Sequence, residues 1–401
     1  MTWKIKISTI SDIIIFLFFC NILGDALNLM FFNIILLLSI GCILIKNIGN
    51  YIKSVFSLYG IWLLTFSLII FASSFWALSQ SSAMNMAKTF IKVAFMSIYI
   101  YCETDTFEKL LLRINQFLAA TVFMMAKVMI AYFTSNERLD AFTQGAGLHF
   151  NTVAQILAFS IILSFWFIIN QKNNKNNIRR MIYIYYSYIL LAFLMIIWSG
   201  SRKSIMIPII GIACVILVGK FELKSRFRYI AFGLLIGFVV VYSVMSNDVL
   251  SNRFSDLFDT LLYSSDSDVS AIERQYYRDT AWHLFLNKPL LGWGADGFME
   301  YLDRIRYSHV AYCHNNMLEI LSSFGIIGFG LYYWFYFFLL IRLFMVKEKY
   351  FNMGTILFTV ILVLLIFEYG IVTYYFSVYH VLFCFAAIFL KFNNKKLKRE
   401  I

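Results

Sequence analysis

The stretch NTVAQILAFSIILSFWFIIN, residues 151–170, contains no charged side chain over twenty positions. An α-helix of about twenty apolar residues is long enough to cross the hydrocarbon core of a bilayer. Comparable apolar runs recur along the 401 residues, with short polar breaks between them. We therefore place twelve predicted transmembrane helices, at about 8–27, 29–46, 55–76, 86–102, 112–134, 151–170, 181–198, 204–220, 229–246, 315–346, 353–371 and 373–390.

The composition agrees with this interpretation. Hydrophobic residues make up 61% of the chain and charged residues only 14%, a balance that a soluble domain of this length could not cover with polar surface. The sequence therefore predicts an all-α polytopic membrane protein, with residues 1–401 forming a single integral membrane domain.

The positions of Lys and Arg test the predicted number of spans, because these residues accumulate in cytoplasmic loops. If the N-terminus is cytoplasmic, 22 of the 34 Lys and Arg residues fall on the cytoplasmic side. Both termini are then predicted to be cytoplasmic. The first apolar run has no small-residue cleavage site and continues into a second run, so no cleavable signal peptide is predicted.

One long loop, residues 247–313, is predicted to face outward. It carries ten acidic and six basic residues, so the net charge of +12 reflects the cytoplasmic loops and does not indicate a nucleic-acid partner. The six cysteines lack metal-binding spacing, and Walker, Rossmann and HExxH motifs are absent. The sequence therefore predicts neither a metal site nor a cofactor.

Within this loop, residues 270–286 have the pattern of an amphipathic helix that would lie on the outer leaflet. Arg274 and Arg278 are four positions apart and share one face, and Pro289 and a glycine-rich turn, LLGWGADGF at 290–298, follow. Two guanidinium groups on a common face can bind a diphosphate through several charge-assisted hydrogen bonds.

A second pair of cations lies in the turn SGSRKS, residues 199–204, between two predicted spans. Arg202 and Lys203 stand beside serine hydroxyls and a helix N-terminus, a combination that suits a phosphate oxygen. The alternative is an arginine that anchors lipid headgroups from a solvated turn.

Three further polar residues of the outward segments are candidate substrate contacts. Lys88 and Lys92 share one face of the predicted span 86–102 and either reach the interface or face a polar cavity. His149 precedes the span 151–170 and is either a hydrogen-bonded structural residue or part of the site.

His309 and His314 come last, and His314 opens the stretch HNNMLEILSSFGIIGFG, residues 314–330. An imidazole at the rim of a transmembrane helix, beside arginines, can take a proton from a sugar hydroxyl. Asn315, Asn316 and Glu319 are candidates to contact substrate hydroxyls or to orient the imidazole. Alternatively, His314 merely caps the helix.

These stretches resemble the O-antigen polymerase and ligase superfamily, bacterial membrane glycosyltransferases that use undecaprenyl-diphosphate-linked glycans. The resemblance lies in RDTAWHLFLNKPLLGWGADGF at 278–298, with an Arg, a Trp, a Pro and a Gly-x-Gly turn; in the His-Asn stretch at 314–330; and in the Ser-Arg turn at 199–204. His309 has no fixed place in this pattern, and Lys203 adds a charge that many members lack.

The resemblance implies a GT-C-like fold, no nucleotide sugar, no metal, and an undecaprenyl diphosphate leaving group. Arg202 and Arg278 occupy the diphosphate-binding positions of the family, Arg274 is a plausible helper, and His314 stands where the family places its general base. The implied partners are a lipid-linked oligosaccharide, membrane lipid, and a chain-length regulator and flippase of the same pathway. The implied location is the bacterial plasma (inner) membrane.

Polymerase and ligase share the donor and differ in the acceptor, a lipid-linked repeat unit or the lipid A core. The ten carboxylates of the outward loop and the Ile, Asn, Lys and Phe richness of the chain favour a polymerase of O-antigen, capsular or exopolysaccharide. A lipid-linked oligosaccharide flippase is the alternative from another class. It would require charges through the membrane midplane and symmetry between halves, whereas the charges here concentrate at the outer rim.

Overall fold

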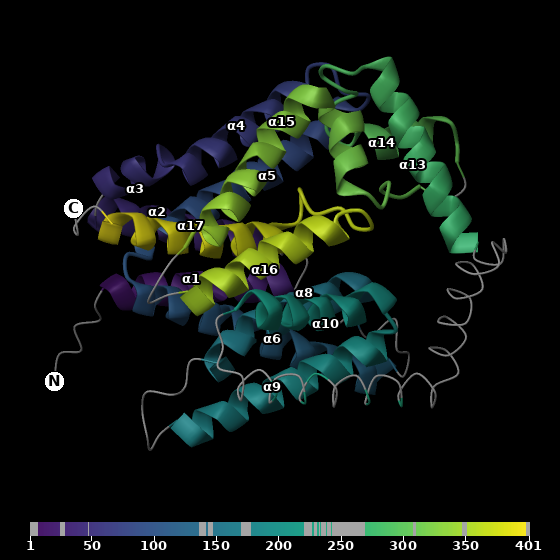
Figure 1. The fold of residues 1–401 in the computed structure, drawn as a ribbon. Helices are drawn as coiled ribbons and strands as arrows, with labels where there is room; N and C mark the ends of the chain where they lie inside the picture. The colour runs from purple at the N-terminus through teal and green to yellow at the C-terminus, as the bar shows by residue number, and fades with distance from the viewer. Residues whose placement is uncertain are drawn as a thin grey trace.

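The computed structural model describes residues 7–24, 29–46, 48–135, 142, 147–169, 178–219, 269–307, 310–346 and 351–397, together with 227, 231, 233, 238 and 242. All regular elements among these residues are helices, and they pack side by side in a bundle (Figure 1). Their bounds are α1 Ile7–Gly24, α2 Leu29–Lys46, α3 Ile48–Val55, α4 Leu58–Ser73, α5 Gln80–Glu103, α6 Phe107–Ser135, α8 Phe150–Ile169, α9 Ile178–Ser199, α10 Arg202–Val218, α13 Val269–Asn287, α14 Gly297–Arg304, α15 Asn316–Phe344, α16 Phe351–Phe367 and α17 Ser377–Leu397.

A helix overlaps every predicted span except 229–246, which lies outside the described residues apart from 231, 233, 238 and 242. Within the described part of the chain, three helical segments are long and apolar enough to cross a membrane: Phe107–Thr134, Phe150–Ile169 and Asn316–Phe344. The pair Met30–Lys46 and Ile48–Val55 meets the same test together but is bent by 114°. The remaining apolar helices are shorter. The structure therefore supports a polytopic helical membrane protein. The number of twelve transmembrane spans remains a prediction.

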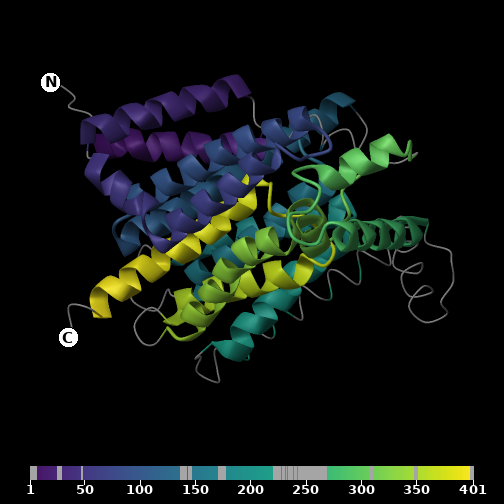
Figure 2. The ribbon, with the colours of Figure 1, turned by 90° about the horizontal axis from the view of Figure 1, so that it is seen from above.

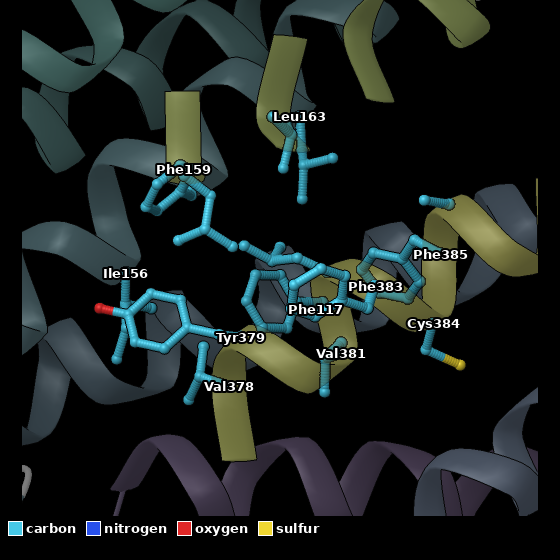
Figure 3. Packing of buried hydrophobic residues seen from close by; sticks show 14 of the residues in the cluster. Phe117, Ile156, Phe159, Leu163, Val378, Tyr379, Val381, Phe383, Cys384 and Phe385 are labelled. Carbon is cyan, nitrogen blue, oxygen red and sulfur yellow. The ribbon is translucent and has the colours of Figure 1, made fainter. Parts of the chain in front are cut away.

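The core of the bundle forms around α17, whose side chains from Val378 to Leu390 are all buried. Figure 3 shows aromatic and branched side chains of α17 packed among those of α6 and α8, with Phe385 edge-on to Phe117 and Tyr379 edge-on to Phe159. The Tyr379 hydroxyl donates to the Gln155 side chain at 2.7 Å. Buried apolar area and dispersion contacts of this kind hold the helices in place.

The helices α13 and α14 project from one end of the bundle, where they pack against the first half of α15 (Figures 1 and 2). The predicted amphipathic helix 270–286 corresponds to α13. Its apolar side, Tyr277, Ala281 and Leu284, forms a small second core with Phe298 and Leu302 of α14. The helix therefore buries its apolar face against α14.

The helix α15 is broken at Gly325, which has a φ of 62° and a ψ of −165°. The carbonyls of Ser322 and Ser323 accept the backbone N–H groups of Trp293 and Gly294 at 2.9 and 2.8 Å. A Cβ on Gly325 would lie 2.3 Å from the carbonyl group of Leu290. Only glycine tolerates both this φ and this contact. The backbone of the turn 289–294 can therefore pack directly against the backbone of α15 at the break, and we call this segment the docked turn.

Candidate functional site

The turn between α9 and α10 places the first two cations. Gly200, with a φ of 73°, reverses the chain, and Arg202 and Lys203 are the first residues of α10. The Lys203 ammonium is half-buried and donates to the Gly370 carbonyl at 2.5 Å. This bond ties the turn to residues 368–376, the segment between α16 and α17, which we call the α16–α17 link.

The helix α13 supplies the second pair. Arg274 and Arg278 are both partly exposed. The Arg278 guanidinium donates to the Gln275 side chain at 2.6 Å and lies over the Tyr369 ring, 5.8 Å from its centroid. An arginine held by a neutral amide and an aromatic face keeps its full positive charge available to an anion.

His314 lies between α14 and α15 in a left-handed conformation, with a φ of 55°. Its ring has two aromatic neighbours, with ring centroids 4.3 Å from that of Tyr312 and 6.1 Å from that of Tyr277. A non-glycine residue with positive φ costs about 1–3 kcal/mol and persists only where its surroundings hold it. The neighbouring rings therefore help to fix the imidazole.

The cations and His314 share one electrostatic environment. Burial, together with the charges of Arg274, Lys203, His149 and Arg278, lowers the pKa of His314 from its usual 6.5 to about 3. A like charge depresses the pKa of an imidazole only when it is close by. Lys203 of α10, the two arginines of α13 and His149, which precedes α8, therefore act electrostatically on this ring.

Burial and neighbouring positive charges also affect the ammonium group of Lys203. Burial, together with the charges of Arg274, Arg278 and Arg202, lowers the pKa of Lys203 to about 8. Cations that depress one another's proton affinity repel, so the arrangement favours an anion between them. We call Arg202, Lys203, Arg274 and Arg278 the cationic cluster.

Three residues predicted as possible substrate contacts make hydrogen bonds within the protein. Asn315 caps α15, since its side chain accepts the Leu318 N–H at 3.0 Å. Glu319 is buried, and one of its oxygens accepts the Cys313 N–H at 2.7 Å. Glu319 thus holds the backbone next to His314.

Asn316 is fully buried. Its side-chain oxygen accepts the N–H groups of Thr373 and Tyr374 at 2.8 and 3.1 Å, and its NH₂ donates to the Tyr333 hydroxyl at 2.9 Å. Every polar atom of this side chain is therefore engaged, which joins α15 to the α16–α17 link. No feature of the sequence distinguishes this asparagine from one that binds substrate.

The structure divides the remaining candidates. His149 contributes to the environment of His314, accepts the Asn151 N–H at 3.3 Å, and has its own pKa lowered by burial. Lys92 donates to the Asn33 side chain of α2 at 2.9 Å, and Lys88 is exposed. His309 lies outside the described residues.

Sequence reasoning missed the α16–α17 link, EYGIVTYYF at 368–376. It contributes a backbone carbonyl to Lys203 and an aromatic ring to Arg278. Neither contribution requires a charged residue, so the charge pattern could not reveal it. The only available signal was the break between two apolar runs.

Among the described residues, no three His, Cys, Asp or Glu side chains come together as metal ligands would. The site instead combines four cations with one neutral imidazole at the end of the bundle. Such a constellation can bind a diphosphate and stabilise the charge that develops on it as a leaving group.

Comparison with known proteins agrees with this chemistry. The O-antigen ligase family matches residues 187–333, a range that contains Arg202, Lys203, α13 and His314. The teichuronic acid biosynthesis protein TuaE of Bacillus subtilis (strain 168) is 25% identical over 347 residues, which cover 78% of this chain and 69% of TuaE. Both matches support the O-antigen polymerase and ligase superfamily. The resemblance predicted from the sequence is thereby confirmed.

Proposed function

We propose that this protein is a metal-independent glycosyltransferase that polymerises undecaprenyl-diphosphate-linked oligosaccharide repeat units on the outer face of the bacterial plasma membrane. The observation that carries the proposal is the convergence of cations from α10 and α13 around His314. A lipid diphosphate would neutralise the repulsion within this cluster.

In this proposal the cationic cluster binds the diphosphate of the donor. The guanidinium groups of Arg274 and Arg278 offer forked donors, and Lys203 adds a point charge. As the glycosidic bond to the diphosphate breaks, negative charge grows on the leaving oxygen. Cations placed beforehand stabilise that charge without moving, and a diphosphate needs no proton to leave.

His314 is the general base of the proposed reaction and takes the proton from the acceptor hydroxyl as it attacks the sugar. Its neutral form is the one that can accept a proton, and the lowered pKa keeps it neutral. Binding of the diphosphate places negative charge beside the ring, which raises its affinity for the proton at the moment when it is needed.

The acceptor decides between the two activities of the superfamily. A polymerase extends a lipid-linked repeat unit, and a ligase transfers the glycan to lipid A core. The relative TuaE is named for teichuronic acid biosynthesis, which supports assembly of a glycan chain. The outward loop with ten carboxylates, which suits a neutral or basic repeat unit, also supports a polymerase. We further propose a flippase and a chain-length regulator as partners in the same pathway.

The test uses the purified protein in nanodiscs with a polyprenyl-diphosphate-linked oligosaccharide and EDTA. Gel analysis should show a ladder of longer lipid-linked chains, and Arg278→Gln and His314→Ala should abolish it. Arg306→Gln is the matched control, because Arg306 is an exposed cation of the same outward segment. A ladder from both site variants would refute the assigned roles. Transfer to lipid A core without a ladder would identify a ligase.

A further inference from the structure

Glu368 carries a buried carboxyl group that the proposed reaction does not use. It directly follows the end of α16 and is fully buried. Its Oε2 accepts the Tyr333 hydroxyl at 2.7 Å, and its Oε1 accepts the Tyr336 hydroxyl at 3.0 Å and the hydroxyl of Thr373. Among the described residues, no cation forms an ion pair with it. Three hydroxyl donors therefore stabilise this buried group in place of an opposite charge.

These hydrogen bonds fasten the α16–α17 link to α15. Tyr333 and Tyr336 belong to α15, whereas Thr373 lies within the link, five residues after Glu368. The Glu368 backbone carbonyl also accepts the N–H of Asn316 at 2.9 Å. Because a buried hydroxyl or carboxyl oxygen left without a partner is costly, this network holds the segment 368–373 in one position against α15.

The segment held in this way contains the acceptor of Lys203. The Gly370 carbonyl accepts the Lys203 ammonium at 2.5 Å, and a Cβ on Gly370 would lie 2.5 Å from the same Nζ atom. The lysine therefore lies directly against the backbone of the link. The preceding residue, Tyr369, lies under the Arg278 guanidinium. The position of the link thus determines where cations of both α10 and α13 are held.

We propose that Glu368 is a positioning residue of the diphosphate site: it anchors the α16–α17 link to α15, so that the Gly370 carbonyl holds the Lys203 ammonium within the cationic cluster. The inference rests on the proposed function for the identity of the anion. Like charges in the cluster repel, so the lysine stays beside the arginines only while its carbonyl partner is fixed. Glu368 acts through the link, because both of its oxygens already accept hydroxyl groups.

The first measurement is the affinity of the full-length protein in nanodiscs for inorganic pyrophosphate, by isothermal titration calorimetry. Glu368→Gln keeps the shape of the side chain but replaces one acceptor oxygen with an NH₂ donor, so that three hydroxyl donors compete for one oxygen. The displaced link should weaken pyrophosphate binding by about fivefold or more, because small misplacements of a binding group have large effects.

A second variant tests the same step without touching the buried network. Gly370→Ala should also weaken pyrophosphate binding by about fivefold or more, because the added methyl group displaces the Lys203 ammonium while every charge is kept. Gly370 does not have a positive φ, so the substitution strains no backbone. Gly330→Ala is the matched control, since a Cβ there meets nothing within 4 Å, and it should leave the affinity unchanged.

The second measurement depends on neither binding nor activity. Acetylation of Lys203 by an amine-reactive reagent, followed by mass spectrometry, reports whether the Gly370 carbonyl still holds the ammonium. Labelling should rise by about threefold or more in Glu368→Gln as the link opens, while labelling of Lys288, an exposed lysine, stays unchanged. In a Lys203→Met background, Glu368→Gln should weaken pyrophosphate binding by less than about twofold further, because the side chain through which it acts is absent.

The inference is overturned if Glu368→Gln lowers the unfolding temperature but leaves pyrophosphate affinity and Lys203 labelling at their wild-type values, since the carboxyl group would then stabilise the fold alone. It is also overturned if the effect on affinity is undiminished in the Lys203→Met background. If the wild type binds pyrophosphate but extends no glycan, the proposed polymerase activity fails and the binding data still test the positioning role. If the wild type binds no pyrophosphate, the proposed anion site fails, and the labelling of Lys203 decides whether Glu368 positions it.

Discussion

Replacing Asn316 with alanine tests whether this residue supports the structure or contacts the substrate. The substitution leaves the N–H groups of Thr373 and Tyr374 without their acceptor and removes a donor from the Tyr333 hydroxyl, all of them buried. Each orphaned buried donor costs about 1–3 kcal/mol. The two N–H groups together should therefore lower the free energy of unfolding by about 2–6 kcal/mol.

The neighbouring asparagine provides a matched control. Asn315 makes one side-chain bond, the cap to Leu318, so Asn315→Ala should cost about 1 kcal/mol. Unfolding in mixed micelles with increasing SDS measures both free energies, and the ladder assay measures transfer. If Asn316→Ala costs no more than Asn315→Ala, or if it abolishes transfer while stability is unchanged, the structural role is refuted and a substrate contact is indicated.

Three further predictions concern the helix break, the imidazole and the cationic cluster. Gly325→Ala should destabilise the protein by at least about 2 kcal/mol, because of its positive φ and the 2.3 Å approach to Leu290. Gly330→Ala, where a Cβ meets nothing within 4 Å, should be neutral or stabilising in the same micelle assay; equal effects would contradict the docked turn. Since the folded-state pKa of His314, about 3, lies below 6.5, stability should fall as the pH drops from about 6.5 toward 3. His314→Gln should lack this component in thermal melts, and an unchanged pH dependence would contradict the buried, neutral imidazole. Arg278→Lys should raise the KM for the lipid donor about tenfold, about 1.4 kcal/mol, through loss of the forked contact; an unchanged KM would exclude a forked contact between Arg278 and the diphosphate.

The parts of the structure that follow from local sequence were predictable. Length and hydropathy located a helix at each apolar run that the structure describes, and the spacing of Arg274 and Arg278 located α13. The cationic cluster was also foreseeable in outline, because charges beside a membrane are costly and persist mainly where they are used. Its convergence on His314 required the tertiary structure.

The roles of individual polar residues were not predictable, because they depend on partners distant in sequence. The side-chain amide of Asn316 makes its hydrogen bonds to groups that are 17, 57 and 58 residues away in the sequence. Nothing in HNNMLE distinguishes it from an asparagine that faces a sugar. The break in α15 at Gly325 likewise depends on a partner distant in sequence, the turn 289–294. The sequence of α15 alone does not predict at which residue the helix is broken.

The arrangement of these contacts suggests how the site is assembled. Through the docked turn and the second core, α13, α14 and the first half of α15 form one unit that carries Arg278 and His314. Arg202 and Lys203 belong to a different unit, α9 and α10. The α16–α17 link contacts both, through Tyr369 under Arg278 and the Gly370 carbonyl on Lys203. Because Asn316 anchors this link to α15, a loss of that anchor would separate the two halves of the cationic cluster without removing a single charge. The spacing of the cations, and with it the geometry in which they bind an anion, therefore depends on a backbone carbonyl and an aromatic ring of the link.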